Sequence, residues 1–263
     1  MDNATRLQYL EAMGIDVWVP RHQPIAIPPA AVHPENSVEN SGETHQGRSS
    51  NREVSSFIET LSSEYPQHCA SSPSSHANDQ LWKDLQYEVS LCRACSLCET
   101  RTQTVFGVGN KHATWMLIGE APGQNEDLQG EPFVGKAGQL LTEMLRAMGL
   151  KREEVYIANM LKCRPPNNRD PQAEEVAACN GFLQQQIELI QPKIILAVGR
   201  IAAQNLLDTQ QPLAKLRGVQ HQLHNIPLIV IHHPAYLLRS LLEKAKAWSD
   251  LQFALSVYQK LEK

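Results

Sequence analysis

Four cysteines stand in two pairs that could bind one metal centre. Cys92 and Cys95 form a C-x2-C pair, and Cys163 and Cys179 follow after an interval of 67 residues, with 15 residues between them. Two thiolates two residues apart can grip one metal in a loop. Four thiolates at such a spacing suit a [4Fe–4S] cluster or a structural zinc ion.

Cys69 and Cys98 bring the cysteines to six, and Cys98 forms an overlapping C-x2-C with Cys95. The N-terminus, MDNATRLQYLEAMGIDVWVPR, lacks the basic start and long apolar run of a secretory signal. We therefore expect a cytoplasmic protein with reduced thiols, in which metal ligation is favoured over disulfides. Spacing alone leaves three interpretations open, namely a [4Fe–4S] cluster, a zinc site and six unrelated thiols.

Polar residues follow four short apolar runs, which are Trp115–Gly119, Val155–Ala158, Ile194–Gly199 and Leu228–Ile231. The residues that come after them include Glu120, Asn159, Arg200 and the pair His232-His233. In open parallel sheets, ligands bind beyond the carboxyl ends of the strands. We therefore expect these side chains to meet at one edge of a sheet.

Helical patterns separate the apolar runs, at Gly138–Gly149, Gln172–Ile190 and Ile201–Leu207. Strands that alternate with helices predict an α/β fold, with a parallel sheet and helices on both of its faces.

The chain divides into three predicted parts. Residues 1–22 form a short amphipathic helix, which Pro20 ends because proline cannot continue a helix. Residues 23–80 are rich in Ser, Pro, Asn, His and Glu, and such a segment buries too little apolar surface to offset its chain entropy. We expect a disordered linker there and a folded domain at 81–263.

The charges are distributed unevenly over the chain. The whole sequence has 24 Lys and Arg against 28 Asp and Glu, and residues 1–87 hold 5 of the basic and 11 of the acidic side chains. Residues 88–263 therefore carry a net charge of about +2, so any contact with phosphate must come from a local patch of this part. No window of eighteen apolar residues occurs, so no membrane span is expected.

The segment GEAPGQNEDLQGEPFVGKAG (119–138) contains neither a Walker motif nor G-x-G-x-x-G. Together with four other motifs it resembles the family 4 uracil-DNA glycosylases, the iron–sulfur branch of the uracil-DNA glycosylase superfamily. The other motifs are CRACSLCETR (92–101), VYIANMLKCRPPNNRDP (155–171), EEVAACN (174–180) and HHPAYLLR (232–239). They cover nearly all of residues 88–263 in the order of the family.

The resemblance implies a three-layer α/β/α sandwich on a four-stranded parallel central sheet. It also implies a [4Fe–4S] cluster whose ligands are Cys92, Cys95, Cys163 and Cys179. This cluster would be structural and would hold the loops that face DNA. Cys98 occupies a place where the family pattern requires no cysteine.

The resemblance further implies a pocket for a uracil that has been flipped out of DNA. Phe133 would stack on the base. The amide of Asn159 offers a donor and an acceptor, which could pair with uracil O4 and N3–H, whereas cytosine presents the opposite pattern. Gly123 and Glu126 are expected to line the same pocket.

Two residues are expected to perform the chemistry, which is hydrolysis of the N-glycosidic bond. His233 would donate to uracil O2 as negative charge develops on the departing base. Glu120 would position or deprotonate water and stabilise the cationic sugar. The product would be an abasic site, so the expected activity is the first step of base excision repair.

The DNA grip is predicted on two loops. Leu237 and Leu238 would act as an apolar wedge in the gap left by the base, with Arg239 on phosphate. Arg164 and Pro165 would press on the DNA backbone. The expected partner is uracil-containing DNA, single- or double-stranded.

Other interpretations remain open from sequence. A relative with another base preference or with covalent attachment to DNA is disfavoured, because the interval QNEDLQGE lacks the extra basic loop of the covalent branch. A DNA-binding module without catalysis is disfavoured by the joint presence of Glu120, Phe133, Asn159 and His233. For residues 1–22 three interpretations remain open, namely docking on a replication or repair protein, folding back onto the catalytic domain, and disorder.

Overall fold

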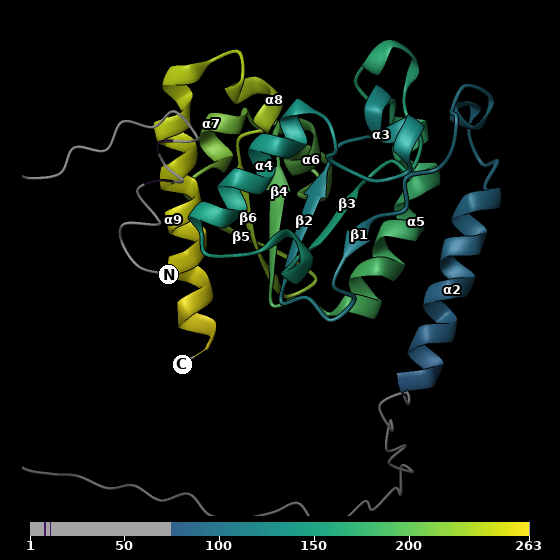
Figure 1. Ribbon diagram of the computed structural model, residues 1–263, viewed down its shortest axis with the longest axis horizontal. Helices are drawn as coiled ribbons and strands as arrows, with labels where there is room; N and C mark the ends of the chain where they lie inside the picture. Colours follow the sequence, from purple (N-terminus) through teal and green to yellow (C-terminus); the bar gives the residue numbers. More distant parts are fainter. Residues whose placement is uncertain (1–7, 9–10, 12–74, 263) are drawn as a thin grey trace, which may run out of the picture. The chain divides into compact units, whose positions relative to one another are not determined.

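The computed structural model describes residues 75–262 together with positions 8 and 11. The predicted helix at 1–22, apart from positions 8 and 11, and most of the predicted linker at 23–80 thus lie outside the described residues. The domain at 75–262 is a sheet between two layers of helices (Figure 1). None of the helices in this range has the length and apolar character that a membrane crossing requires.

The sheet contains six strands in the order β1-β3-β2-β4-β6-β5. These are β1 (Val108–Gly109), β2 (Trp115–Gly119), β3 (Tyr156–Asn159), β4 (Ile194–Val198), β5 (Gln220–Leu223) and β6 (Ile226–Ile231). The four inner strands run parallel, whereas β1 and β5 pair antiparallel at the two edges. The prediction of a four-stranded parallel sheet was therefore wrong in strand number and type, although all four predicted strands are present at its centre.

The two edge strands have no apolar run that would have revealed them. β1 is only two residues long, and β5 has the sequence QHQL, of which no residue is buried. β5 joins β6 through His224 and Asn225, which have φ angles of 49° and 65°. Positive φ at both central residues is the geometry of a tight hairpin turn. The hairpin thus adds a polar edge strand that hydrophobic periodicity does not detect.

The helices alternate with the inner strands as predicted. They are α2 (Ser75–Leu91), α3 (Gln124–Gln129), α4 (Lys136–Ala147), α5 (Ala173–Ile190), α6 (Arg200–Leu206), α7 (Leu213–Leu216), α8 (Pro234–Leu237) and α9 (Lys244–Leu261). The three predicted helices correspond to α4, α5 and α6, with ends that agree within two residues. Short 3-10 turns include η1 (Ser96–Glu99), η3 (Pro166–Asn168) and η4 (Leu241–Glu243).

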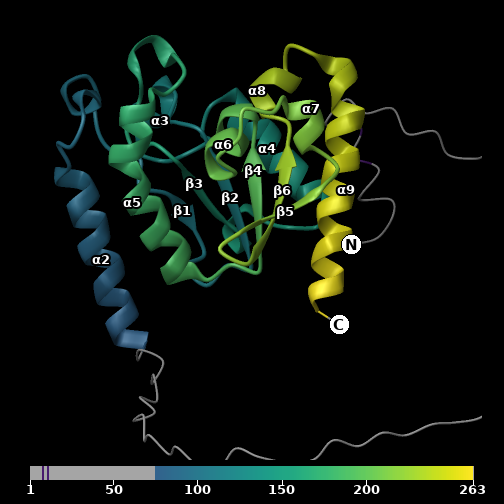
Figure 2. The same ribbon diagram turned by 180° about the vertical axis from the view of Figure 1, so that it is seen from behind.

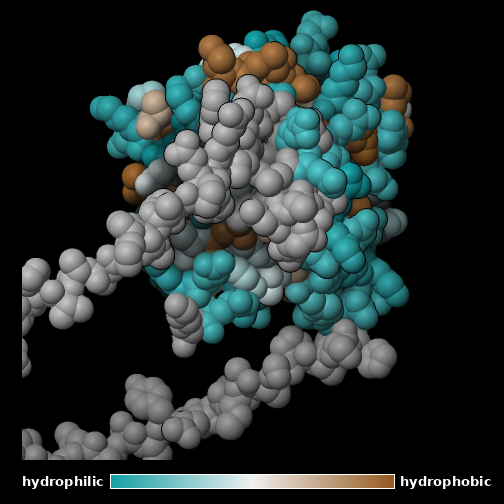
Figure 3. Space-filling model, turned by 60° about the vertical axis from the view of Figure 1, so that its left-hand side comes forward, coloured by the Kyte–Doolittle hydropathy of each residue, from teal (hydrophilic) through white to brown (hydrophobic). Residues whose placement is uncertain are grey.

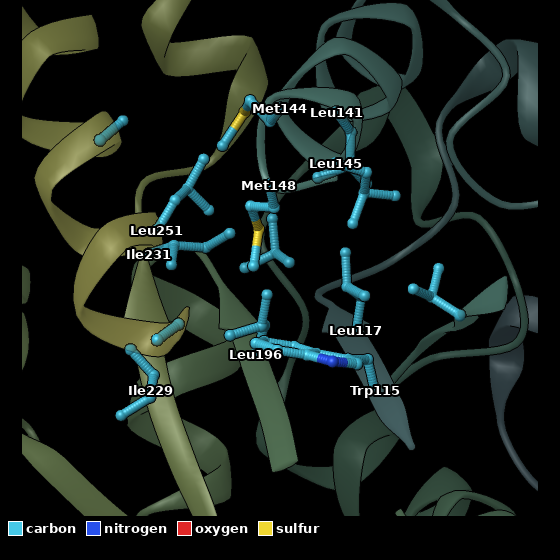
Figure 4. Close-up of a cluster of buried hydrophobic side chains, with 14 of the residues drawn as sticks. Trp115, Leu117, Leu141, Met144, Leu145, Met148, Leu196, Ile229, Ile231 and Leu251 are labelled. Atoms are coloured by element: carbon cyan, nitrogen blue, oxygen red, sulfur yellow. The ribbon is translucent and has the colours of Figure 1, made fainter. Parts of the chain in front are cut away.

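Successive side chains of the inner strands point to opposite faces and fill two cores. Trp115 and Leu117 of β2 pack with residues of α4 and α9 on one face (Figure 4). Met116 and Ile118 pack with residues of α2 and α5 on the other. Strands covered on both faces are apolar throughout, which explains why they appear in the sequence as unbroken apolar runs.

Helix α2 belongs to the folded domain, although its first residues fall within the predicted linker. Its side chains Trp82, Leu85 and Val89 are buried, and the Trp82 ring lies edge-on to Phe106 and Tyr156 at 5.4 Å from each ring centroid. α2 lies beside α5 (Figure 2). α2 starts six residues before the expected domain boundary at 81.

Candidate active site

A cavity of about 790 Å³ opens where the inner strands end. Glu120 follows β2, Asn159 ends β3, Gly199 follows β4, and His233 lies two residues beyond β6. All four strand ends predicted from the sequence therefore meet at one cavity. Its lining also includes Gly123, Glu126, Phe133, Pro165 and Arg239 from the predicted set.

Phe133 sits in the cavity wall on a strained backbone. Its φ is 54°, a left-handed conformation that is rare and costly for an aromatic residue. A Cβ on Gly138 would overlap the Phe133 carbonyl, and a Cβ on Gly119 would overlap both the Phe133 ring and Asn159 Oδ1. Gly119 thus leaves room for the ring and the amide, and Gly138 leaves room for the main chain of Phe133.

Asn159 is buried, with 2% of its surface exposed, and its Oδ1 has no hydrogen-bond partner among the described residues. A buried acceptor without a partner costs about 1–3 kcal/mol. Because Asn159 also lines the cavity beside Phe133, this atom is available to a ligand that donates an N–H group.

His233 is half-buried and is neutral at physiological pH. Burial and, to a lesser extent, the charge of Arg239 lower the pKa of His233 to about 4. The imidazole Nδ1 accepts from the Ala235 N–H at 3.1 Å, at the start of α8. That bond places the ring proton on Nε2, so His233 is a neutral donor. Its ring centroid lies 5.8 Å from that of Phe133.

Glu120 is partly buried at the end of β2. Burial raises the pKa of Glu120 to about 7, and the negative charge of Asp170 adds to the rise while Arg200 opposes it. Arg200 donates to Asp170 Oδ2 at 3.1 Å, so these two charges form a pair near the carboxyl group. A carboxyl with a pKa near neutrality can exchange a proton under physiological conditions.

Glu126 supports the Phe133 loop. Its Oε1 accepts from the main-chain N–H groups of Val134 and Gly135 at 2.9 and 3.0 Å. A Cβ on Gly123 would lie 2.7 Å from Glu126 Oε2, so the glycine leaves room for this carboxylate. Glu126 and Gly123 thus position the loop that carries the aromatic ring.

The predicted DNA-gripping residues do not all lie together. Arg239 and Pro165 line the cavity, whereas Arg164 does not line it and donates to Oδ1 of the lining residue Asn168 at 2.7 Å. Leu237 is buried in the core, so the prediction of Leu237 as an exposed wedge is contradicted. Its side chain packs from α8 into the core cluster that includes Leu140 and Met144 of α4, while that of Leu238 is 42% exposed.

Further exposed apolar side chains continue from Leu238 along the chain. Tyr236, Leu241 and Leu242 are exposed, and Leu242 reaches 91%. Hydrophobic side chains gather at the upper edge of the face in Figure 3, at the height of α8 in Figure 1. The apolar surface beside the cavity is thus centred on η4 as well as on the predicted Leu238.

The cysteines surround a second, small cavity. Cys92, Cys95, Cys163 and Cys179 all line it, as does Cys98. Within residues 75–262, however, no three His, Cys, Asp or Glu side chains are grouped closely enough to hold one metal ion. The four predicted ligands thus line the same small cavity without forming such a group, and they come from α5, the loop after β3 and the loop after α2.

Two N–H donors point at sulfur in this cavity. Arg101 Nη1 donates to Cys163 Sγ at 3.0 Å, and the Lys162 main-chain N–H donates to Cys179 Sγ at 3.3 Å. Burial raises the pKa of the Cys163 thiol and raises that of Cys179 to about 11. Buried thiols need a bound cation or such donors before they carry charge.

Other residues of the large cavity were not predicted from the sequence. They include Arg169 and Lys246, which line its wall. His232, which was expected at this edge together with His233, lines the cavity as well; it is buried, and its Nδ1 has no hydrogen-bond partner among the described atoms. Arg169 follows the CRPP segment, so a basic residue near a Pro-rich loop was a usable signal. No feature of the sequence indicated Lys246, because only the packing of α9 beside β6 brings this residue to the cavity.

The chain was compared with known proteins. A model of the uracil DNA glycosylase superfamily matches residues 106–252, more than half of the chain. A type-4 uracil-DNA glycosylase of Archaeoglobus fulgidus is 49% identical over 163 residues, which cover 59% of this chain and 82% of that protein. One of Thermotoga maritima is 45% identical over 63% of this chain and 87% of that protein.

A more distant match shows which branch of the superfamily the chain resembles more. A type-5 uracil-DNA glycosylase of Pyrobaculum aerophilum is 33% identical over 36% of this chain and 48% of that protein. The type-4 matches thus have higher identity over a longer part of the chain, as the sequence motifs predicted. The chain therefore belongs to the uracil DNA glycosylase superfamily, and within it to the type-4 uracil-DNA glycosylases.

Proposed function

We propose that this chain excises uracil from DNA by hydrolysing the N-glycosidic bond. The single observation that carries the proposal is the partnerless Oδ1 of Asn159, buried beside Phe133 at the head of a large cavity. Uracil N3–H is a donor that would satisfy this acceptor, and the amide nitrogen could donate to O4. Cytosine has an acceptor at N3, so it would leave Asn159 Oδ1 mispaired.

Binding starts with extrusion of the base. Flipping a nucleotide costs a few kcal/mol, and stacking on an aromatic ring recovers about 1–3 kcal/mol per base. Phe133 supplies that ring on a backbone already held in its strained conformation by Glu126. The pocket is thus organised before the base arrives, which reduces the ordering cost of binding.

Bond cleavage leaves negative charge on uracil and positive charge on the sugar. His233 is neutral with its proton on Nε2, so it donates a hydrogen bond to the leaving base without being an acid. Glu120, with a pKa of about 7, takes the proton of the attacking water in its ionised form. The carboxylate also stabilises the developing cation on the sugar.

A [4Fe–4S] cluster is proposed on Cys92, Cys95, Cys163 and Cys179. The donor set supports it, because four soft sulfur ligands line one cavity and N–H groups of Arg101 and Lys162 point at two of them. Bound there, the cluster would cross-link the loops and would take no part in the hydrolysis. A structural zinc on the same thiols is the alternative.

The DNA grip is proposed on the cavity rim. Arg239 and Pro165 line the cavity that the flipped nucleotide enters, and Arg164 lies on the adjoining loop. Leu238 is the exposed member of the predicted pair and would enter the base stack. We also retain two predictions from the sequence, that residues 1–22 dock on a replication or repair protein and that the protein is cytoplasmic.

The test is uracil release from labelled oligonucleotides, single-stranded and paired with guanine or adenine. We expect strand cleavage after alkali treatment for uracil and none for matched cytosine or thymine oligonucleotides. A stable protein–DNA adduct that survives denaturation would indicate the covalent mode instead. Tight binding without base release would leave only a DNA-binding module and would overturn the proposal.

A further inference from the structure

Lys162 is a buried lysine whose position the proposed mechanism does not explain. Only 1% of its surface is exposed, and no carboxylate pairs with its amino group among residues 75–262. Lysine is rarely buried without a pairing partner. Its ε-amino group instead donates to two neutral acceptors, the main-chain carbonyl of Asn159 at 2.8 Å and Gln186 Oε1 at 2.6 Å.

The second acceptor is itself fixed. Gln186 is fully buried on α5, and its Nε2 donates to the Phe106 carbonyl at 3.0 Å and to Tyr156 Oη at 3.3 Å. These bonds orient the amide so that its oxygen faces Lys162. The amino group is therefore held between α5 and the last residue of β3.

The first acceptor belongs to the residue proposed to recognise the base. Beyond Asn159 the chain continues to pair with the end of β2, since the Met160 N–H donates to the Gly119 carbonyl and the Leu161 N–H donates to the Glu120 carbonyl. Lys162 then turns back and bonds the Asn159 carbonyl with its side chain. The peptide group that aims the Asn159 amide is thus fixed by Lys162.

The main chain of Lys162 is tied to the cysteine cavity. Its N–H donates to Cys179 Sγ at 3.3 Å, and its carbonyl accepts from the Val105 N–H at 2.8 Å. Lys162 lines the cysteine cavity but not the large one. It can therefore act on the bound base only through another residue.

We propose that Lys162 is a positioning residue, which holds the Asn159 carbonyl and thereby aims the Asn159 amide at the base. The inference rests on the proposed uracil excision. Lys162 joins the base-recognition residue to the loop that carries Cys163. A buried polar contact of this kind is costly to break, because both acceptors lose their donor.

The test compares single-turnover uracil release by wild type and Lys162→Met, which keeps the chain length and removes the donor. We expect the maximal rate to fall by about 10- to 100-fold, since a displacement near 1 Å can cost 10²-fold. The DNA concentration at half-maximal rate should change by less than about threefold, because no DNA contact is lost. Lys193→Met, at an exposed lysine before β4, is the matched control and should match wild type.

A double-mutant cycle separates positioning from loss of structure. In an Asn159→Ala background, Lys162→Met should slow release by less than about threefold, because the group it positions is gone. An equal loss in both backgrounds, or a wild-type rate in Lys162→Met, would overturn the inference. If Lys162→Met does not fold, the same double-mutant cycle is measured with Gln186→Leu in its place. Lys162→Gln should recover part of the rate, because it keeps an N–H donor. Wild type without any uracil release would instead refute the proposed function.

Discussion

Glu120 combines two properties of a general base, a place at the cavity and a pKa of about 7. Because the ionised form is the active one, the single-turnover rate of wild type should rise about tenfold between pH 6 and pH 8. Glu120→Gln should remove this rise and lower the rate at pH 8. A rate profile in wild type that is flat from pH 6 to pH 8 would exclude Glu120 as the base.

The same pKa shift has an effect on stability that can be measured without substrate. An unfolded glutamate ionises near pH 4.5, whereas folded Glu120 holds its proton to about pH 7. The folded state therefore binds more protons in this window, so this residue makes stability fall as the pH rises. Thermal unfolding should show that Glu120→Gln is more stabilising at pH 8 than at pH 4.5.

Substitution of Asn159 tests its proposed role in base recognition. Asn159→Asp removes the amide donor and places a carboxylate oxygen opposite uracil O4, so uracil release should fall by about 10²–10³-fold. Release of cytosine relative to uracil should increase, since a carboxylate can accept from the cytosine amino group. Asn205→Asp, at an exposed position of α6, is the control and should leave both rates unchanged. Unaltered discrimination in Asn159→Asp would remove Asn159 from the base pocket.

At the scale of elements, the strand ends approach one another so closely that glycine is required. Gly119→Ala would push its Cβ into Asn159 Oδ1 and the Phe133 ring, so we expect about a 10²-fold loss of rate with DNA binding retained. Gly181→Ala on α5 meets no neighbour and should instead raise stability by about 0.5–1 kcal/mol. Kinetic and unfolding measurements on this pair separate a crowded glycine from a free one.

The cysteines connect three segments that no strand joins. Cys179→Ala should remove the absorbance expected at about 400 nm for a [4Fe–4S] protein and lower the melting temperature. Cys98→Ala changes a thiol of the same cavity that the family pattern does not require, so it should keep both. Colourless wild-type protein with one zinc per chain, purified without oxygen, would favour the zinc alternative.

At the scale of the whole molecule, the catalytic domain is expected to be independent of the N-terminal segment. Deletion of residues 1–72 leaves α2 intact, including the buried Trp82, so uracil release and melting temperature should be unchanged. The same deletion should abolish capture of a replication or repair partner, and Trp18→Ala should weaken it. Loss of release or of folding in the truncated protein would show that the segment belongs to the catalytic domain.

The sequence by itself determined the four inner strands, three of the helices and most of the cavity. Inner strands are buried on both faces, so their apolar runs are visible without a structure, and residues at their carboxyl ends must share one edge. Glu120, Asn159 and His233 could therefore be predicted together. The motifs that carry family membership are likewise local stretches of chain.

Only the tertiary structure decided the features that depend on contacts between distant segments. β1 and β5 are strands because their backbones pair with those of β3 and β6. Leu237 is not exposed as a wedge, because α8 packs against α4. The raised pKa of Glu120 likewise follows from burial and from Asp170, which lies 50 residues away in the sequence. Such effects depend on distances in space, which residue types and spacing along the chain do not contain.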